Sequence, residues 1–330
     1  MKCFRMTPLI MATLASCLMA APGMALAEKI TIAIGGSGQS LQGQTAKRFA
    51  DGLQERLGDD YQVEYYDSGQ LGDEKQLVQK LRLKTVDMAA ISTVMSSVVP
   101  AFALFDLPYL INDRQQMQSI NDELVMTELA ERARKRGLVP VSTWENGFRQ
   151  ITNNRRAINT PADLKGLKIR VPPSEWRSMM FTQWGANPTP MAFSEVFVGL
   201  QTGVIDGQEN PLTNIYGARL HEVQNYLSMT NHVYSPIWLM TGLQWWDKQP
   251  EEVRQAIQEE AQDAQRWAFK RGQEMDEELL ERFEAEGIRI NEVDREAFID
   301  ASQPVYERFA SQVEGGESLI DRARGAEGQQ

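Results

Sequence analysis

Cysteine and histidine are nearly absent from this chain of 330 residues. It contains two cysteines, Cys3 and Cys17, and two histidines, His221 and His232. Both cysteines lie in the first 27 residues, so the remainder has no thiol for a disulfide, a zinc–thiolate site or a cysteine nucleophile. His221-Glu222 lacks the second histidine of a zinc-protease helix, and no G-x-S-x-G turn is present. The sequence therefore predicts neither a metal site nor a cofactor, and common hydrolase motifs are missing.

Positive charge is also scarce. Lysine and arginine number 34 against 45 aspartates and glutamates, which gives a formal net charge of −11. Binding to a nucleic-acid backbone normally requires a surplus of positive charge, so no nucleic-acid partner is expected. A hydrophobic content of 42% is ordinary for a globular protein, and the length is sufficient for two domains.

Long hydrophobic runs are limited to the N-terminus. A basic start is followed by an uncharged stretch from Leu9 to Ala20 and by a small-x-small sequence at Ala25-Leu26-Ala27. The stretch is shorter than the ~20 residues that span a bilayer. The pattern predicts a signal peptide over residues 1–27 and export across the cytoplasmic membrane. Its removal takes away two positive charges and changes the net charge from −11 to −13. Residues 14–17 also resemble a lipoprotein-processing site, so lipid anchoring through Cys17 is the alternative.

Strands and helices alternate along the remaining chain. The spacing of apolar residues predicts a strand over residues 29–35 and a helix ending at Leu57. Further strands are predicted over 139–144, 149–152 and 167–171, and a helix over 174–184. This alternation with short connections predicts an α/β fold with helices on both faces of a sheet.

The longest predicted element is a helix from Glu251 to Glu286, which contains no proline and is followed by Gly287. At ~1.5 Å per residue it would be roughly 54 Å long. A compact unit of half the chain has a diameter of only about 38 Å. We therefore expect this helix to span two lobes with a cleft between them. A pair of helices broken near Gly272 is the alternative.

Two arginines have apolar neighbours within predicted strands. Arg170 lies between Ile169 and Val171, and Arg149 follows Phe148. A buried arginine needs an anionic partner, and its planar guanidinium suits a carboxylate. The partner is either the carboxylate of a ligand or one of the chain's own acidic residues, and the sequence pattern alone does not decide between them.

Several motifs resemble the DctP family, the extracytoplasmic solute-binding proteins of tripartite ATP-independent periplasmic (TRAP) transporters. The two long runs are GANPTPMAFSEV at 185–196 and LQTGVIDGQENP at 200–211. Shorter supporting segments are SGQLGDE at 68–74, DLPY at 106–109, PADLKGLKIRVP at 161–172 and MTNH at 229–232. The resemblance extends across the chain that follows the predicted signal peptide.

The resemblance implies an α/β fold of two lobes, like a type II periplasmic binding protein, with the long helix spanning both lobes. It divides the chain into lobe I (residues 28–146 and about 236–275) and lobe II (147–235 and about 276–330). It also implies a periplasmic location, no enzymatic activity and a monomer.

The resemblance further implies which residues bind a ligand. Arg170 corresponds to the position that pairs with the substrate carboxylate, and Arg149 to a second cationic contact. Asn210 corresponds to a side chain that hydrogen-bonds the same carboxylate region. Phe193 matches an aromatic wall of the cleft, and Glu74 falls where some members contact substrate hydroxyls or waters.

Two further positions concern specificity. Ser92 stands where sialic-acid-binding members carry an acidic residue, so sialic acid is not the expected ligand. Trp176 has no fixed identity in the family, and it either covers a small ligand or belongs to the hydrophobic core.

The implied function is capture of a small organic acid and its delivery to the small and large permease subunits in the membrane. Both sugar acids such as uronates and C4-dicarboxylates fit one carboxylate on Arg170. Glu74 favours a sugar acid, because it repels a second carboxylate and accepts hydrogen bonds from hydroxyls. Two other functions remain open: a periplasmic hydrolase or isomerase that uses carboxylates such as Asp206 and Glu209, and a ligand-sensing partner of a receptor.

Overall fold

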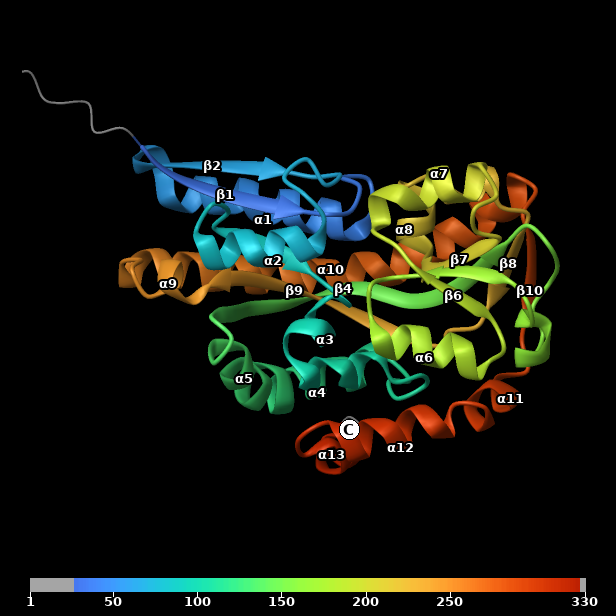
Figure 1. The fold of residues 1–330 in the computed structure, drawn as a ribbon. Helices are drawn as coiled ribbons and strands as arrows, with labels where there is room; N and C mark the ends of the chain where they lie inside the picture. Colours follow the sequence, from blue (N-terminus) through green and yellow to red (C-terminus); the bar gives the residue numbers. More distant parts are fainter. Residues whose placement is uncertain (1–26, 327–330) are drawn as a thin grey trace, which may run out of the picture.

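The computed structural model describes residues 27–326, in which ten strands join into one mixed sheet with helices on both sides (Figure 1). The expected signal peptide, apart from Ala27, lies outside the described residues, and so does Cys17. Within residues 27–326, no helix has the length and apolar character needed to cross a bilayer.

The strands are short, with the exception of two. Their bounds are β1 Glu28–Ile34, β2 Tyr61–Tyr66, β3 Met88–Ile91, β4 Leu138–Asn153, β5 Lys168–Val171, β6 Asn187–Pro190, β7 Gly207–Pro211, β8 Tyr226–Met229, β9 Tyr234–Gly242 and β10 Arg289–Glu292.

The helices include one of 35 residues, α10. The α-helices are α1 Leu41–Leu57, α2 Glu74–Leu83, α3 Met95–Val98, α4 Arg114–Ile120, α5 Ala130–Arg134, α6 Glu175–Gln183, α7 Val196–Gln201, α8 Leu212–Gly217, α9 Leu243–Trp246, α10 Glu251–Ala285, α11 Arg295–Asp300, α12 Gln303–Gln312 and α13 Gly316–Gly325. Short 3₁₀ or π turns are η1 Gly58–Asp60, η2 Pro100–Asp106, η3 Asn121–Leu129, η4 Pro161–Leu164, η5 Phe193–Glu195 and η6 Leu220–Val223.

The strand order β2-β1-β3-β9-β4-β7-β5-β6 divides the sheet into two lobes that share β4. In lobe I, β1 pairs in parallel with β2 and β3, and β9 runs antiparallel between β3 and β4. In lobe II, β5 pairs in parallel with β6 and β7, and β8 joins β4 to β10. The protein thus has the expected two-lobe α/β fold, with each lobe built on its own part of the sheet.

The strand β4 passes from one lobe into the other. Its residues 138–148 pair with β9, and its residues 149–153 pair with β7 and partly with β8. The prediction of two separate strands at 139–144 and 149–152 is therefore wrong. Gly147 carries a positive φ of 113° beside an irregularity in the β4–β9 register, and glycine adopts this conformation without steric cost. The Glu145-Asn146-Gly147 segment between the two predicted strands is instead a bulge within one continuous strand.

The helix α10 spans both lobes, as the length argument predicts. It runs behind the sheet from the α1 side to the α8 side (Figure 1). Its first half contributes Val253 and Ile257 to the core formed with β1 and α1, whereas its second half contributes Met275 and Phe283 to the core formed with α7 and α8. The helix is unbroken at Gly272, where a Cβ atom would come within 2.8 Å of the Glu145 side chain. The glycine therefore allows α10 to lie close against β4.

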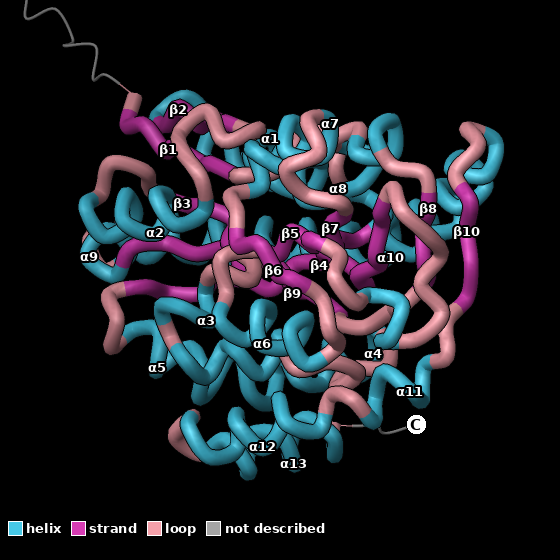
Figure 2. Tube along the Cα trace, turned by 45° about the vertical axis from the view of Figure 1, so that its right-hand side comes forward, coloured by secondary structure: helices cyan, strands magenta, loops and turns pink. Residues whose placement is uncertain are grey.

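The C-terminal helices form a separate layer. In both views, α12 and α13 lie beneath α4 and α6 (Figures 1 and 2). The helix α12 packs on α6 of lobe II, while α13 packs on α4 and η2, which belong to lobe I. The C-terminal segment thus touches both lobes, and the residue boundaries of the lobes stay a prediction.

Candidate functional site: a cavity between the two lobes

A cavity of about 290 Å³ lies where the two lobes face each other. Its wall comes from the ends of β1, β3 and β5, the starts of α1 and α2, the crossing strand β4, and the segments before α7 and α8. The lining residues are Gly35, Gly36, Gln42, Gly69, Asp73, Glu74, Lys75, Ser92, Thr93, Val94, Asn146, Arg149, Arg170, Pro172, Pro173, Pro190, Met191, Ala192, Phe193, Ser194, Glu195, Asn210 and Asn214. Six of the seven residues proposed from the sequence are in this set.

Arg170 reaches the cavity from β5 and has no carboxylate partner within residues 27–326. Its Nε and Nη2 atoms donate to the Met191 carbonyl oxygen at 2.9 and 2.6 Å, and the side chain is buried. The guanidinium also lies 5.8 Å from the centre of the Phe193 ring. Burial lowers the pKa of Arg170 to about 9, because the charged form has lost its hydration. An anion in the cavity would supply the missing counter-charge.

Arg149 also lines the cavity, but its charge is already paired. Its guanidinium forms a salt bridge with Glu209, in which Nη2 donates to Oε1 at 2.9 Å. The same nitrogen donates to the Glu209 carbonyl at 2.6 Å and to Asn210 Oδ1 at 3.1 Å. Of the two alternatives left open by the sequence, the internal salt bridge thus forms at Arg149, and none forms at Arg170 in the described part of the chain.

Glu209 is the centre of a buried salt-bridge network behind the cavity. Besides Arg149, it pairs with Arg177 at 3.2 Å and with the His232 ring at 3.1 Å. Arg177 in turn forms a 2.8 Å salt bridge with Asp106. The two arginines hold the pKa of Glu209 well below its usual range despite burial. Burial lowers the pKa of His232 to about 4, so its ring is neutral at pH 7 and donates to Glu209.

This network includes residues that the sequence analysis did not propose for the site. Arg177 and Asp106 had no assigned role, although Asp106 belongs to the DLPY motif and His232 to the MTNH motif. The carboxylates considered for a hydrolase do not face the cavity together. Glu209 is enclosed by its cationic partners, and Asp206 accepts from the Lys168 amide and pairs with Arg155. Within the described chain, no group of three or more His, Cys, Asp or Glu is placed to hold a metal ion.

Glu74 enters the cavity from the first turn of α2, next to Ser92. Its Oε2 atom accepts a hydrogen bond from the Ser92 amide at 3.1 Å, and burial raises its pKa to about 7. The positive charges of Arg170 and Arg149 act in the opposite direction but do not outweigh this effect. The Ser92 hydroxyl donates to the Pro236 carbonyl at 2.9 Å, which leaves Ser92 without a free donor toward a ligand.

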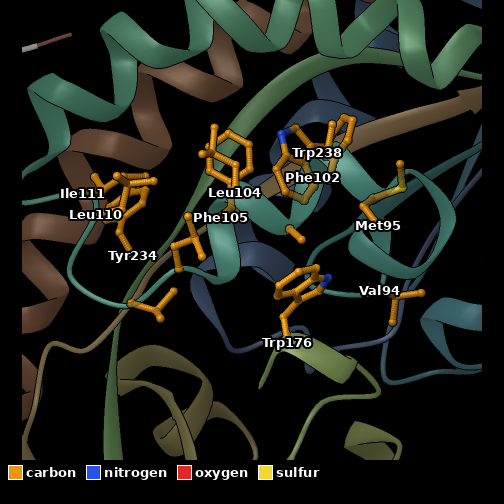
Figure 3. Packing of buried hydrophobic residues seen from close by; sticks show 14 of the residues in the cluster. Val94, Met95, Phe102, Leu104, Phe105, Leu110, Ile111, Trp176, Tyr234 and Trp238 are labelled. Carbon is orange, nitrogen blue, oxygen red and sulfur yellow. The ribbon is translucent and has the colours of Figure 1, made fainter. Parts of the chain in front are cut away.

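Trp176 does not line the cavity, and of the two alternatives left open by the sequence the structure favours the hydrophobic core. Its ring packs against Phe309 at 5.6 Å between centroids, and only 3% of the residue is exposed. Figure 3 shows Trp176 within the cluster that contains Val94, Met95 and Phe102. The Ser174 cap that starts α6 places Trp176 on the core side of this helix, while the preceding Pro172 and Pro173 border the cavity.

The fold and this cavity define a class of protein: a two-lobe binding protein with a ligand site between its lobes. The model of the DctP family, described as bacterial extracellular solute-binding protein family 7, matches residues 33–312. The chain belongs to this family. Solved relatives are described as TRAP periplasmic solute-binding proteins.

Individual relatives have names that mention different organic acids. The 2,3-diketo-L-gulonate-binding periplasmic protein YiaO of Escherichia coli is 35% identical over 83% of this chain and 85% of its own. The C4-dicarboxylate-binding periplasmic protein DctP of Vibrio cholerae is 34% identical over 80% of each chain. The sugar acid binding protein DctPAm of Advenella mimigardefordensis, solved with galactonate, has a TM-score of 0.87 and 29% identity, and the match covers 91% of this chain and 99% of that one.

We predict that Glu209→Gln lowers the free energy of unfolding by about 3–5 kcal/mol, because it leaves Arg149 buried without its counter-charge and leaves Arg177 with Asp106 as its one remaining carboxylate partner in residues 27–326. Denaturant unfolding measures this loss. Glu251→Gln is the control, since Glu251 pairs with Arg254 at the exposed start of α10 and should cost about 1 kcal/mol or less. A loss of similar size in both variants would contradict the role of Glu209.

Proposed function

We propose that the protein is the solute-binding subunit of a TRAP transporter, which captures a small organic acid in the periplasm and delivers it to the permease subunits in the membrane. The acid is a sugar acid, such as a uronate, or a C4-dicarboxylate, and its carboxylate pairs with Arg170. The observation that carries this proposal is the buried Arg170 guanidinium, which faces the cavity with no carboxylate partner in the described chain. Family membership supports the periplasmic location and the permease partners.

The ligand would bind through the part of Arg170 that Met191 does not occupy. Met191 holds one edge of the guanidinium through Nε and Nη2, so Nη1 remains available. Phe193 lies beside the guanidinium and, with Pro172 and Pro190, supplies apolar wall around the carboxylate. Closure of the lobes about β4, β9 and α10 would then exclude water and strengthen the ion pair. This function needs capture and release of the acid but no bond breaking, and the protein would act as a monomer without a cofactor.

Replacing Arg170 tests the proposal. We expect Arg170→Ala to weaken binding of the organic acid by about 100-fold or more, because a buried ion pair with its hydrogen bonds is lost. Arg170→Lys should lose less, since it keeps the charge but not the planar fork. The melting temperature of the free protein should fall only slightly in Arg170→Ala, because the variant loses the hydrogen bonds to the Met191 carbonyl but breaks no internal salt bridge. Isothermal titration calorimetry measures the affinity, with Arg289→Ala on the exposed side of β10 as the control. Equal affinity in Arg170→Ala and the wild type would refute the proposal.

The raised pKa of Glu74 predicts that binding depends on pH. Below about pH 7, Glu74 is neutral and does not oppose an anion in the cavity. Above that pH it is ionised and repels the ligand carboxylate, so affinity should fall between pH 6 and 8 and binding should take up a proton. Glu74→Gln keeps this side chain neutral at every pH and should flatten the dependence of affinity on pH. Burial also raises the pKa of Glu145 to about 7, so Glu145 titrates in the same range, and the variant distinguishes the effect of Glu74 from that of Glu145. The same slope in the variant and in the wild type would exclude Glu74 as its source.

A further inference from the structure

The cavity holds one buried cation, Arg170, that has no carboxylate partner in residues 27–326, together with several neutral polar side chains that are not fully hydrogen-bonded there. We infer that it selects an organic acid with a single carboxylate and several hydroxyl groups, and that Gln42 is a residue that determines this specificity. The inference rests on the proposed function, because it takes Arg170 as the site of the carboxylate. It goes beyond that function by choosing between the two ligand classes that Arg170 alone admits.

The first argument is the number of buried cations that are available to a ligand. Arg149 is occupied by Glu209, and Arg177 is shared by Glu209 and Asp106. Lys75 lines the cavity but is exposed, so water already solvates its ammonium group. A second carboxylate would therefore be buried without a partner, close to Glu74. Such a charge costs several kcal/mol, which disfavours a dicarboxylate.

The second argument is the state of Gln42, near the start of α1. Gln42 is only 4% exposed and lines the cavity, yet its side-chain amide makes no hydrogen bond to the described part of the chain. The amide is held against Gly36, where an added Cβ would lie 1.7 Å from Gln42 Nε2. A buried amide without hydrogen-bond partners destabilises the protein unless a ligand or a water molecule forms hydrogen bonds with it. Hydroxyl groups suit it well, because each can both donate and accept.

Two other side chains that line the cavity, Thr93 and Asn146, also have polar atoms without a hydrogen-bond partner in the described residues. Thr93, which follows β3, is 8% exposed, and its hydroxyl has no hydrogen-bond partner between residues 27 and 326. Asn146 on β4 accepts from Asn214 Nδ2 at 3.1 Å, which leaves the other end of the Asn146 amide unpaired beside the cavity. If the oxygen and nitrogen positions are exchanged in the side-chain amides of both Asn146 and Asn214, one end of the Asn146 amide is still unpaired. The cavity thus offers at least three neutral hydrogen-bonding groups in addition to Arg170.

The placement of these groups fits a ligand that bridges the lobes. Gln42 and Thr93 belong to lobe I, Arg170 belongs to lobe II, and Asn146 lies on the strand that crosses between them. A carboxylate on Arg170 would direct the rest of the molecule toward Gln42 and Thr93. The hydroxyl groups would then connect lobe I to a ligand that lobe II already holds, whereas an acid without hydroxyls would leave these side chains unsatisfied.

The experiment is a binding screen of the whole protein with organic acids of four to six carbons, followed by calorimetry. The probes are galactonate and galacturonate with the other aldonates and uronates of four to six carbons, adipate and succinate as dicarboxylates, and hexanoate as a monocarboxylate without hydroxyls. We expect the best sugar acid to bind at least tenfold more tightly than adipate, succinate or hexanoate. A dicarboxylate that binds as tightly as the best sugar acid would overturn the inference. The proposed function would survive that result if Arg170→Ala abolished binding of the dicarboxylate, and it would fail if no acid bound.

The role of Gln42 has its own test. Gln42→Met keeps the length of the side chain and removes the amide, so affinity for the best sugar acid should fall about three- to tenfold. Affinity for hexanoate or succinate, where measurable, should not change. Gln249→Met is the matched control, because Gln249 is also buried with an unpaired amide oxygen but lies outside the cavity. Unchanged affinity of Gln42→Met for the sugar acid, with a normal melting temperature, would exclude Gln42 as a specificity residue.

Discussion

The pairing of Glu209 with two buried arginines determines the character of the cavity. Three arginines, Arg149, Arg170 and Arg177, are buried close to one another behind or beside it. Because Glu209 and Asp106 neutralise Arg149 and Arg177, Arg170 is the one among the three whose charge is not paired with a carboxylate of residues 27–326. The network therefore contributes to stability and also limits the number of charges that a ligand can neutralise.

The fold places this network at the junction of the two lobes. The strand β4 carries Asn146 and Arg149 through the junction, and Gly147 between them adopts a backbone conformation that favours glycine. The helix α10 lies close against the same strand at Gly272. Near this point Glu145 pairs with Arg114 at 2.8 Å, and Arg114 also pairs with Asp276 of α10 at 2.6 Å. A movement of the lobes relative to each other would thus involve the strand that carries Asn146 and Arg149 into the cavity.

Periodicity and length predicted the architecture well, because both reflect local geometry. The helix over 174–184 and the long helix after Glu251 were predicted from spacing and are present as α6 and α10. The gap predicted between the strands 139–144 and 149–152 is instead a bulge in β4. Polar residues and glycine are common both in bulges and between strands, so the sequence does not distinguish the two. The fold brings Glu74, Arg170 and Phe193, which the resemblance to the family assigns to ligand binding, to one cavity, although these residues are far apart in the sequence. Their contact with a ligand stays a prediction.

Contacts between residues that are distant in the sequence, such as salt bridges, were not predictable from periodicity or length. Arg149 and Arg170 have similar sequence surroundings, and only the three-dimensional position of Glu209 distinguishes the paired arginine from the unpaired one. Trp176 is two residues from Ser174 and three from Pro173, yet it points into the core rather than the cavity. Gln42 and Asn146 have no motif that distinguishes them from surface amides, so their position in the cavity became visible only in the structure.

The most direct measurement is a crystal structure of the protein with the organic acid that binds it most tightly. The account predicts that the ligand carboxylate lies within about 3 Å of the Arg170 guanidinium, and that Arg149 keeps its salt bridge with Glu209. A ligand carboxylate bound elsewhere, or an Arg170 side chain paired with an aspartate or glutamate of the protein, would contradict the account.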